Sequence, residues 1–302
     1  MTTSLVDFFV IGVARGGTTS LYNYLQQHPG IFLPAVKECN YFSVVESLDK
    51  EVYERPKAGE EYHMKIIRSE AVYSELFLTA EEGQLKGEVS PSYMWDQSTA
   101  ARIFKYNKEA KIIVSLRNPI ERAFSHYLMH VHTGHEKAAT FEEALAQERN
   151  TIWGGGNMYL EMSTYYSQLK PYFDLFDKRQ IRVLIQEEWT QHSAEAMNDT
   201  FRFLGAPPTE GEWNETTFNA SKQLKNKGLL DVLRSKKIKN SLRKIVPEKT
   251  RDKIKEKLFY KDGPKAALDS ATYEKLKAYF KEDMKQTEAL TGLELSEKWN
   301  FN

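Results

Sequence analysis

The residues of this sequence that are best suited to chemistry lie close to its start, at residues 12–19, which run Gly-Val-Ala-Arg-Gly-Gly-Thr-Thr. Glycines let a backbone approach an anion closely, and the hydroxyls of Thr18 and Thr19 add hydrogen-bond donors. Arg15 contributes a positive charge. In a loop between a strand and a helix, backbone N–H groups and the positive end of the helix dipole converge on one spot. We therefore predict an anion-binding loop, and a glycine-rich turn without a ligand is the alternative.

The loop departs from the P-loop of nucleoside-triphosphate kinases, G-x-x-x-x-G-K-[ST]. Its outer glycines and its final threonine match that pattern, but Thr18 occupies the lysine position. A kinase also needs an acidic residue at the end of a second strand to hold Mg²⁺, and the apolar run at residues 111–116 is followed by Arg117 instead. The loop therefore suits a nucleotide whose transferred group carries less charge and needs no metal.

Arg117 is the second candidate anion ligand. It follows the apolar run at residues 111–116, so it lies at the carboxyl edge of the predicted sheet, where ligands bind in open α/β folds. Ser125 comes eight residues later, about two turns into the next helix. Both side chains can then reach one phosphate near the loop. The alternative is that Arg117 pairs with Glu121 or Glu88.

Short apolar runs of strand length alternate with helical patterns along the chain. The runs at residues 8–13, 111–116 and 181–185, with a shorter one at 87–89, are continuous rather than alternating. Continuous apolar strands are buried on both faces, which is typical of a parallel sheet. We therefore predict an α/β fold, a central parallel sheet flanked by helices, which presents the candidate ligands at its carboxyl edge.

Helices are predicted between these strands. Asn118 as N-cap, Pro119 at the first helical position and Glu121 form a capping box at the start of one helix. Another helix covers residues 194–204 and is closed by Gly205. A weak helical repeat near the end of the chain predicts one more helix packed on the core. Its members are Tyr273, Leu276, Tyr279 and Phe280.

Length and composition describe an ordinary folded protein. The chain has 302 residues, of which 41% are hydrophobic and 28% charged, and we expect a single domain over residues 1–302. Its 42 basic residues balance 42 acidic ones, which argues against a nucleic-acid partner. Residues 222–257 nevertheless carry 14 basic side chains against 4 acidic ones. This stretch forms either a solvated helical face or a field that attracts a polyanion.

Cys39 is the single cysteine of the sequence. One cysteine excludes an internal disulfide and a cysteine-built zinc site, and it fits a reducing compartment. No apolar run approaches the roughly 18 residues that span a bilayer, so we expect no integral membrane segment. The first residues lack the basic segment of a signal peptide. We expect a cytoplasmic protein.

Two segments of the sequence resemble a known family. Residues 9–21 are similar to the 5′-phosphosulfate loop of sulfotransferases, and residues 116–127 resemble their 3′-phosphate motif. The resemblance is closest to the heparan and carbohydrate-modifying branch and its bacterial relatives. It implies a P-loop-kinase-like sheet and the donor 3′-phosphoadenosine 5′-phosphosulfate (PAPS). It also implies the nucleotide ligands, which are Arg15, Gly16, Gly17, Thr18, Thr19, Ser20, Arg117 and Ser125.

The same resemblance implies two catalytic residues, Glu38 and Arg15. Residues 38–42, Glu-Cys-Asn-Tyr-Phe, match the context of the family's catalytic base, and Arg15 stands beside the leaving phosphate. Residues 87–93, where the small-phenol branch places a histidine, contain none. The chemistry agrees, because a base must lie within hydrogen-bond reach of the acceptor hydroxyl. Taken alone, Glu38 would be interpreted as a surface carboxylate.

A late segment resembles the short bacterial loop that closes over the nucleotide. This segment covers residues 218–227. We expect the core of the domain at about residues 6–205. Residues 206–302 then form the nucleotide lid and the C-terminal helices. From the segment at 218–227 we expect Lys225 and Lys227 as further phosphate ligands. The segment has no counterpart of the disulfide-bounded loop of the eukaryotic heparan enzymes.

The implied reaction is sulfuryl transfer from PAPS to a hydroxyl, or as a lesser alternative an amine, of a carbohydrate or small-molecule acceptor, with release of adenosine 3′,5′-bisphosphate. No metal is expected, because the histidines at 126, 130 and 132 lack a nearby carboxylate motif. Two rivals stay open: a small-metabolite kinase with a degenerate P-loop, and a non-catalytic nucleotide-binding module. Several aromatic residues either stack on the acceptor or pack in the core. They are Tyr41, Phe42, Trp95, Trp153 and Tyr159.

Overall fold

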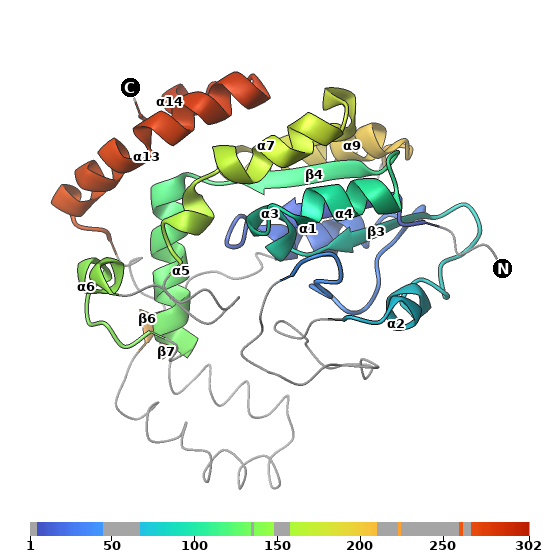
Figure 1. Cartoon of the computed structure of the whole chain (residues 1–302), viewed down its shortest axis with the longest axis horizontal. Coiled ribbons are helices and arrows are strands. Elements are labelled where there is room, and N and C mark those ends of the chain that lie inside the picture. Colours follow the sequence, from blue (N-terminus) through green and yellow to red (C-terminus); the bar gives the residue numbers. More distant parts are fainter. Residues whose placement is uncertain are drawn as a thin grey trace, which may run out of the picture.

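A five-stranded parallel sheet forms the centre of the protein. The computed structural model describes residues 5–44, 67–133, 136–147, 158–209, 223–224, 260–261 and 267–301. All four strand pairs of the sheet are parallel, and Figure 1 shows β4 running towards α5. In spatial order the strands are β2 (Ile31–Phe32), β3 (Leu85–Val89), β1 (Phe8–Gly12), β4 (Lys111–Leu116) and β5 (Ile181–Ile185).

Alternate side chains of β1 enter two different hydrophobic cores. Phe8 and Val10 pack into one buried cluster, and Phe9 and Ile11 pack into the other. All four are fully buried, which explains why the apolar run is continuous rather than alternating. The sequence therefore predicted this strand and its parallel neighbours correctly.

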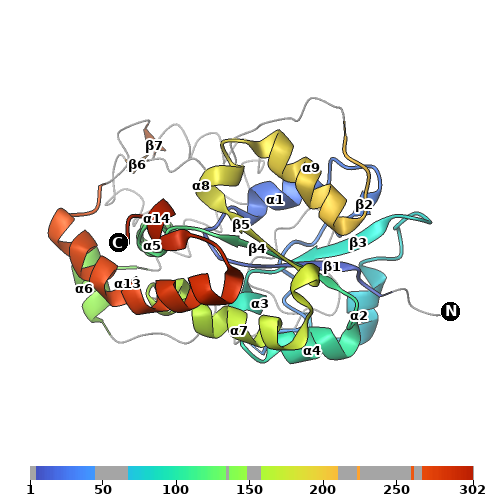
Figure 2. The same ribbon diagram turned by 90° about the horizontal axis from the view of Figure 1, so that it is seen from above.

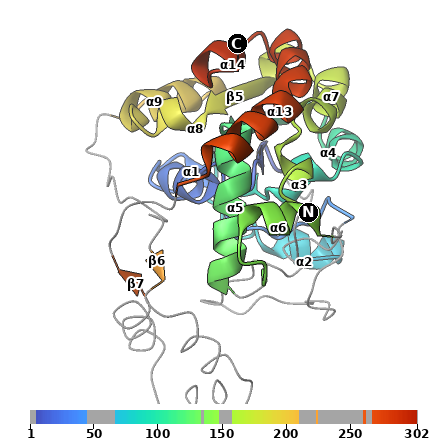
Figure 3. The same ribbon diagram turned by 90° about the vertical axis from the view of Figure 1, so that its left-hand side faces the viewer.

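Helices cover both faces of the sheet, as Figure 2 shows from above. The cluster that contains Phe8 and Val10 is closed by Leu21, Trp189 and Phe201, which come from α1 (Thr18–Leu25), α8 (Gln186–Trp189) and α9 (Ser193–Leu204). The opposite face is covered by α3 (Ser92–Trp95), α4 (Thr99–Tyr106) and α7 (Tyr166–Leu175). The remaining helices include α2 (Glu70–Glu75) and α6 (Phe141–Ala146), the latter beside α5 in Figure 3.

The helix α5 (Pro119–Thr133) begins directly beyond β4. Asn118 is its N-cap, since the Asn118 Oδ1 atom accepts hydrogen bonds from the backbone N–H of Ile120 at 3.0 Å and of Glu121 at 3.3 Å. The predicted capping box is wrong in its second half. The N–H of Asn118 donates to Glu187 Oε1 at 2.9 Å, so a carboxylate from α8 does what Glu121 was expected to do.

The C-terminal helix α13 (Ser270–Thr291) packs against α7 and α5 and continues into α14 (Leu295–Lys298). Its inner side consists of Leu276, Phe280 and Met284, of which the last two are fully buried. Tyr279 was expected on the same side but is 53% exposed, because a one-residue step turns a helical side chain by about 100°. Within the described residues, no helix is long and apolar enough to cross a membrane.

We expect Phe280→Ala to lower the free energy of unfolding by about 3–5 kcal/mol, because it opens a cavity between α13 and the core. An exposed residue of the same helix provides the control: Lys281→Ala is expected to change that free energy by no more than about 0.5 kcal/mol. Urea denaturation followed by circular dichroism measures both. Equal losses in the two variants would contradict the packing of α13 described here.

Candidate functional site

The predicted anion loop connects β1 to α1 at residues 13–17. Arg15 and Gly17 both adopt left-handed backbone conformations, with φ of 71° and 88°, and Gly17 is the N-cap of α1. The first hydrogen bond of the helix runs from Leu21 N to Gly17 O at 3.0 Å. The N–H groups of the preceding first turn therefore point out of the helix end, where the dipole is positive. That turn consists of Thr18, Thr19 and Ser20, which the sequence analysis proposed as ligands.

The loop rests on the end of β4. Ser115 Oγ donates to the carbonyl oxygen of Gly16 at 2.5 Å and accepts from Trp189 Nε1 at 2.8 Å, while Val13 N donates to Ser115 O at 2.9 Å. A Cβ atom at Gly16 would lie 2.5 Å from Ser115 O, which is closer than backbone can tolerate. Glycine is thus required for the close approach. The sequence analysis missed Ser115 and Trp189, because their partners lie on other elements.

Arg15 turns towards α5. Its Nε atom donates to Ser125 Oγ at 3.1 Å, and Arg117 Nη1 donates to the Arg15 carbonyl oxygen at 3.3 Å. Three residues that the sequence proposed separately are therefore brought together at the carboxyl edge of the sheet. Of the two alternatives for Arg117, the structure contains the pairing with Glu121, whose carboxylate lies 3.9 Å from Arg117 Nη2 and is half exposed.

A third arginine lies beneath the loop. Arg122 is fully buried and donates to the carbonyl oxygens of Ala14 at 3.1 Å and Tyr159 at 2.7 Å, and to Ser163 Oγ at 2.5 Å. Burial lowers the pKa of Arg122 to about 10, with further lowering from Arg117 and Arg15. The residues around Arg122 in the sequence form no pattern that separates it from a surface arginine, so its role is visible only in the structure.

The positive charges of Arg15, Arg117 and Arg122 lie close enough together to influence one another. Burial lowers the pKa of Arg15, and the adjacent charge of Arg117 lowers it further. Arg117 Nε is buried without a hydrogen-bond partner among the described residues. A cluster of guanidinium groups with an orphaned donor, next to a helix N-terminus, fits phosphate groups. The residues present are therefore compatible with a phosphorylated nucleotide such as PAPS.

Glu38 lies at the carboxyl end of β3, the strand that pairs with β1. Its backbone N–H donates to Val89 O at 3.0 Å, and its carboxylate forms an ion pair with Lys37. The Glu38 and Lys37 side chains are 15% and 10% exposed, so the pair is far less accessible than an ordinary surface ion pair. Because β1 leads into the anion loop, Glu38 and the loop share the carboxyl edge of the sheet.

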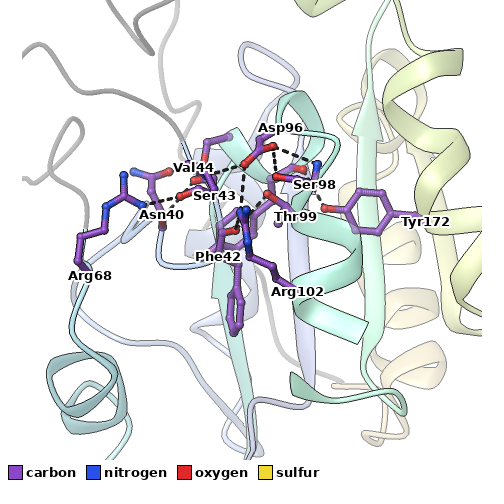
Figure 4. A network of polar contacts seen from close by, with 12 residues as sticks. Asn40, Phe42, Ser43, Val44, Arg68, Asp96, Ser98, Thr99, Arg102 and Tyr172 are labelled. Atoms are coloured by element: carbon purple, nitrogen blue, oxygen red, sulfur yellow. Dashed lines mark hydrogen bonds and ion pairs between the residues drawn. The ribbon is translucent and has the colours of Figure 1, made fainter. Parts of the chain in front are cut away.

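The segment that follows Glu38 is fixed by polar contacts with its neighbours (Figure 4). Arg102 Nη1 donates to the carbonyl oxygen of Phe42 at 2.8 Å, and Arg68 Nη1 donates to that of Ser43 at 2.7 Å. Val44 N donates to Asp96 Oδ2 at 2.5 Å. The two arginines approach from opposite sides, so residues 42–44 are clamped between α4 and the start of α2.

Several residues that the sequence predicts for the site lie in the core or outside the described residues. Lys225 and Lys227, and most of the expected lid and basic stretch, lie outside the described residues, as does Trp153. Phe42 and Tyr159 are buried in the core, so the idea that they stack on an acceptor is wrong. Tyr41 stacks on Tyr73 with ring centroids 4.2 Å apart.

The histidines of α5 are part of the interior. His126 and His130 are buried, with ring centroids 4.3 Å apart. Burial, together with the charge of Arg122, lowers the pKa of His126 well below its usual range, so its ring stays neutral at physiological pH. In the part of the chain that the structure describes, no group of three or more His, Cys, Asp or Glu side chains is placed to hold a metal ion.

Two comparisons with known proteins cover nearly the whole chain. A family model described as "Sulfotransferase domain" matches residues 5–288. A crystal structure of a sulfotransferase from Alicyclobacillus acidocaldarius is similar with a TM-score of 0.69 and 27% sequence identity, over 98% of this chain and 99% of that chain.

Curated relatives are matched over a shorter share of their length. Human carbohydrate sulfotransferase 15 is 25% identical over 249 residues, which are 68% of this chain and 44% of that protein. Human heparan sulfate glucosamine 3-O-sulfotransferase 3A1 is 26% identical over 205 residues, which are 67% of this chain and 44% of that protein. The chain therefore spans less than half the length of these two relatives.

We expect Ser115→Ala to lower the free energy of unfolding by about 1–3 kcal/mol, because it leaves the buried Gly16 carbonyl and the Trp189 indole N–H without their partner. Thr190→Ala, which removes an exposed hydroxyl from the residue next to Trp189, is the control and is expected to stay within about 0.5 kcal/mol. Chemical denaturation measures both variants. An unchanged stability in Ser115→Ala would refute the supporting role of this contact.

Proposed function

The chain belongs to the sulfotransferase family, and from this premise we propose that it transfers a sulfuryl group from PAPS to a hydroxyl of a carbohydrate or small-molecule acceptor, releasing adenosine 3′,5′-bisphosphate. The convergence of Arg15, Arg117 and Ser125 supports the proposal above all, because three segments distant in sequence place phosphate-binding groups together. The partners are then a nucleotide donor and one acceptor.

The anion loop binds the 5′-phosphosulfate in this proposal. The N–H groups of Gly17 and of the first turn of α1 surround its oxygens, and the hydroxyls of Thr18 and Thr19 add donors. Gly16 allows the close approach. Arg117 and Ser125 hold the 3′-phosphate, and the Arg117 side chain, which is 24% exposed, presents its guanidinium group to it. The donor brings an activated sulfuryl group, and the protein has to orient it.

Glu38 acts as the base and Arg15 stabilises the leaving group. The Glu38 carboxylate takes the proton of the acceptor hydroxyl as the new O–S bond forms, while the bond between sulfur and the bridging phosphate oxygen breaks. The charge that develops on the departing phosphate is met by the Arg15 guanidinium and the loop N–H groups. Lys37, paired with Glu38, holds that carboxylate in place before the acceptor arrives.

The acceptor class follows from weaker indications. The names of the curated relatives point to carbohydrates, and the zero net charge of the chain favours a small or neutral acceptor over a polyanion. Incubation with radiolabelled PAPS and a panel of 4-nitrophenyl glycosides, simple alcohols and amines would identify the class. If the protein binds PAPS but none of these compounds becomes labelled, the result would favour a non-catalytic binding module.

We expect Glu38→Gln to lower the transfer rate by about 10²- to 10⁴-fold, since an amide cannot accept the proton. Binding of adenosine 3′,5′-bisphosphate, measured by calorimetry, should change by no more than about twofold. Glu109→Gln, at an exposed glutamate remote from the site, is the matched control. Full activity of Glu38→Gln would exclude this base.

We expect Arg117→Gln to weaken binding of adenosine 3′,5′-bisphosphate by about tenfold or more, and of adenosine 5′-phosphate by about threefold at most, because only the first carries a 3′-phosphate. Titrations in EDTA also test metal independence. Arg179→Gln, at an arginine that is 89% exposed, is the control. Tight Mg²⁺-dependent ATP binding with no preference for a 3′-phosphate would favour the kinase instead.

A further inference from the structure

A second carboxyl group, close to the segment of the proposed base, has no part in the mechanism above. Glu88, the penultimate residue of β3, is fully buried. Its Oε2 atom accepts a hydrogen bond from Tyr73 O–H at 2.7 Å, and its Oε1 atom accepts one from Ser90 O–H at 2.7 Å. The side chains of Cys39 and Tyr93 are close enough to this carboxyl group to influence its pKa.

The donors around Glu88 remain protonated at physiological pH. Burial, reinforced by the charge of Glu88, raises the pKa of Cys39, Tyr73 and Tyr93. Burial also raises the pKa of Glu88 itself, against the opposing effect of these hydrogen bonds. Burying a carboxyl group is unfavourable unless it is hydrogen-bonded, so the hydroxyls of Tyr73 and Ser90 explain how Glu88 is tolerated. They do not explain which role Glu88 has.

Ser90 connects Glu88 to the segment of the base. Its Oγ atom donates to Glu88 and accepts from the backbone N–H of Asn40 at 3.2 Å. The hydroxyl of Tyr93, a neighbour of Glu88, accepts from Phe42 N at 3.3 Å. Cys39 is the residue next to Glu38. The hydroxyls around Glu88 therefore bind the backbone N–H groups of Asn40 and Phe42.

The backbone of this segment needs such support. Glu38 and Asn40 have φ of 62° and 53°, a left-handed conformation that residues other than glycine adopt rarely and retain only where their surroundings enforce it. The clamp of Figure 4 fixes residues 42–44 further along. The hydrogen bonds centred on Glu88 hold the part closest to the base.

We propose that Glu88 is a positioning residue for the proposed reaction: through Ser90, which donates to it and accepts from Asn40 N–H, it holds residues 38–42 in the conformation that presents the Glu38 carboxylate to the acceptor. The inference rests on the proposed function. Glu88 cannot itself touch a substrate, because none of its surface is exposed. It acts through the backbone, and its loss affects proton removal without affecting the nucleotide ligands, which lie on other elements.

Glu88→Gln is the informative substitution. It keeps the shape of the side chain, but its NH₂ group faces a hydroxyl that already uses its hydrogen to donate, so at least one of the two hydrogen bonds from Tyr73 and Ser90 is lost. We expect the transfer rate to fall by about tenfold or more, while the affinity for adenosine 3′,5′-bisphosphate changes by no more than about twofold.

A double-mutant cycle separates positioning from general damage. In a Glu38→Gln background, Glu88→Gln is expected to reduce the remaining rate by less than about twofold, because the group that it positions is already gone. A full additional tenfold loss in that background, or a parallel loss of nucleotide affinity, would overturn the proposal. An unchanged rate in the single variant would also overturn it.

Hydrogen exchange supplies a readout that does not depend on turnover. Amides of residues 38–42 are expected to exchange about tenfold faster in Glu88→Gln, and those of α5 at the wild-type rate. Unchanged exchange at residues 38–42 would count against the proposal. Should Glu88→Gln fail to fold, Ser90→Ala breaks the connection between Glu88 and Asn40. Tyr127→Phe, which removes a buried hydroxyl bonded to Ala138 O and Ala139 O, is its control.

The outcomes also distinguish the inference from the proposed function. A wild-type protein that neither binds adenosine 3′,5′-bisphosphate nor transfers label from PAPS to the probe acceptors would refute the function and with it the inference. A wild-type protein that does both, and whose Glu88→Gln variant does so equally well, would refute the inference alone.

Discussion

The close approach of the anion loop to the end of β4 is the contact on which the rest of the site depends. Gly16 lies against Ser115 with no room for a Cβ atom, and the Ser115 hydroxyl joins the loop to Trp189 on the other side. Because α5 begins directly beyond β4, the same contact sets the distance between Arg15 and Ser125. One packing constraint therefore places the groups proposed for both phosphates of the donor.

This arrangement concentrates like charges. Burial, and after it the charge of neighbouring arginines, lowers the pKa of Arg15 and Arg122. The repulsion among Arg15, Arg117 and Arg122 is offset by hydrogen bonds to the carbonyl oxygens of Ala14, Tyr159 and Arg15 itself. A bound phosphate would relieve the repulsion further. A ligand that binds only the native state stabilises it. Binding of the donor should therefore raise the free energy of unfolding.

The sequence alone determined the fold class, three of the strands to within a residue, and the residues that we propose as principal anion ligands. These features are local. A continuous apolar run defines a strand buried on both faces, Gly17 and Gly205 stand where helix ends require left-handed backbone, and Asn118 caps α5 with its own side chain. Arg15, Arg117 and Ser125 were identified by spacing within short motifs, and parallel strands necessarily bring such motifs to one edge.

Only the tertiary structure decided which buried polar groups support that site. Arg122, Ser115 and Glu88 have no distinctive local pattern, because their roles depend on partners far along the chain: Trp189 is 74 residues from Ser115. The N-cap of α5 likewise receives its carboxylate from Glu187 rather than from the nearby Glu121. Periodicity indicates which side of an element is buried, but not what it meets there. A buried hydrogen bond is defined by both of its atoms, and the second one comes from the fold.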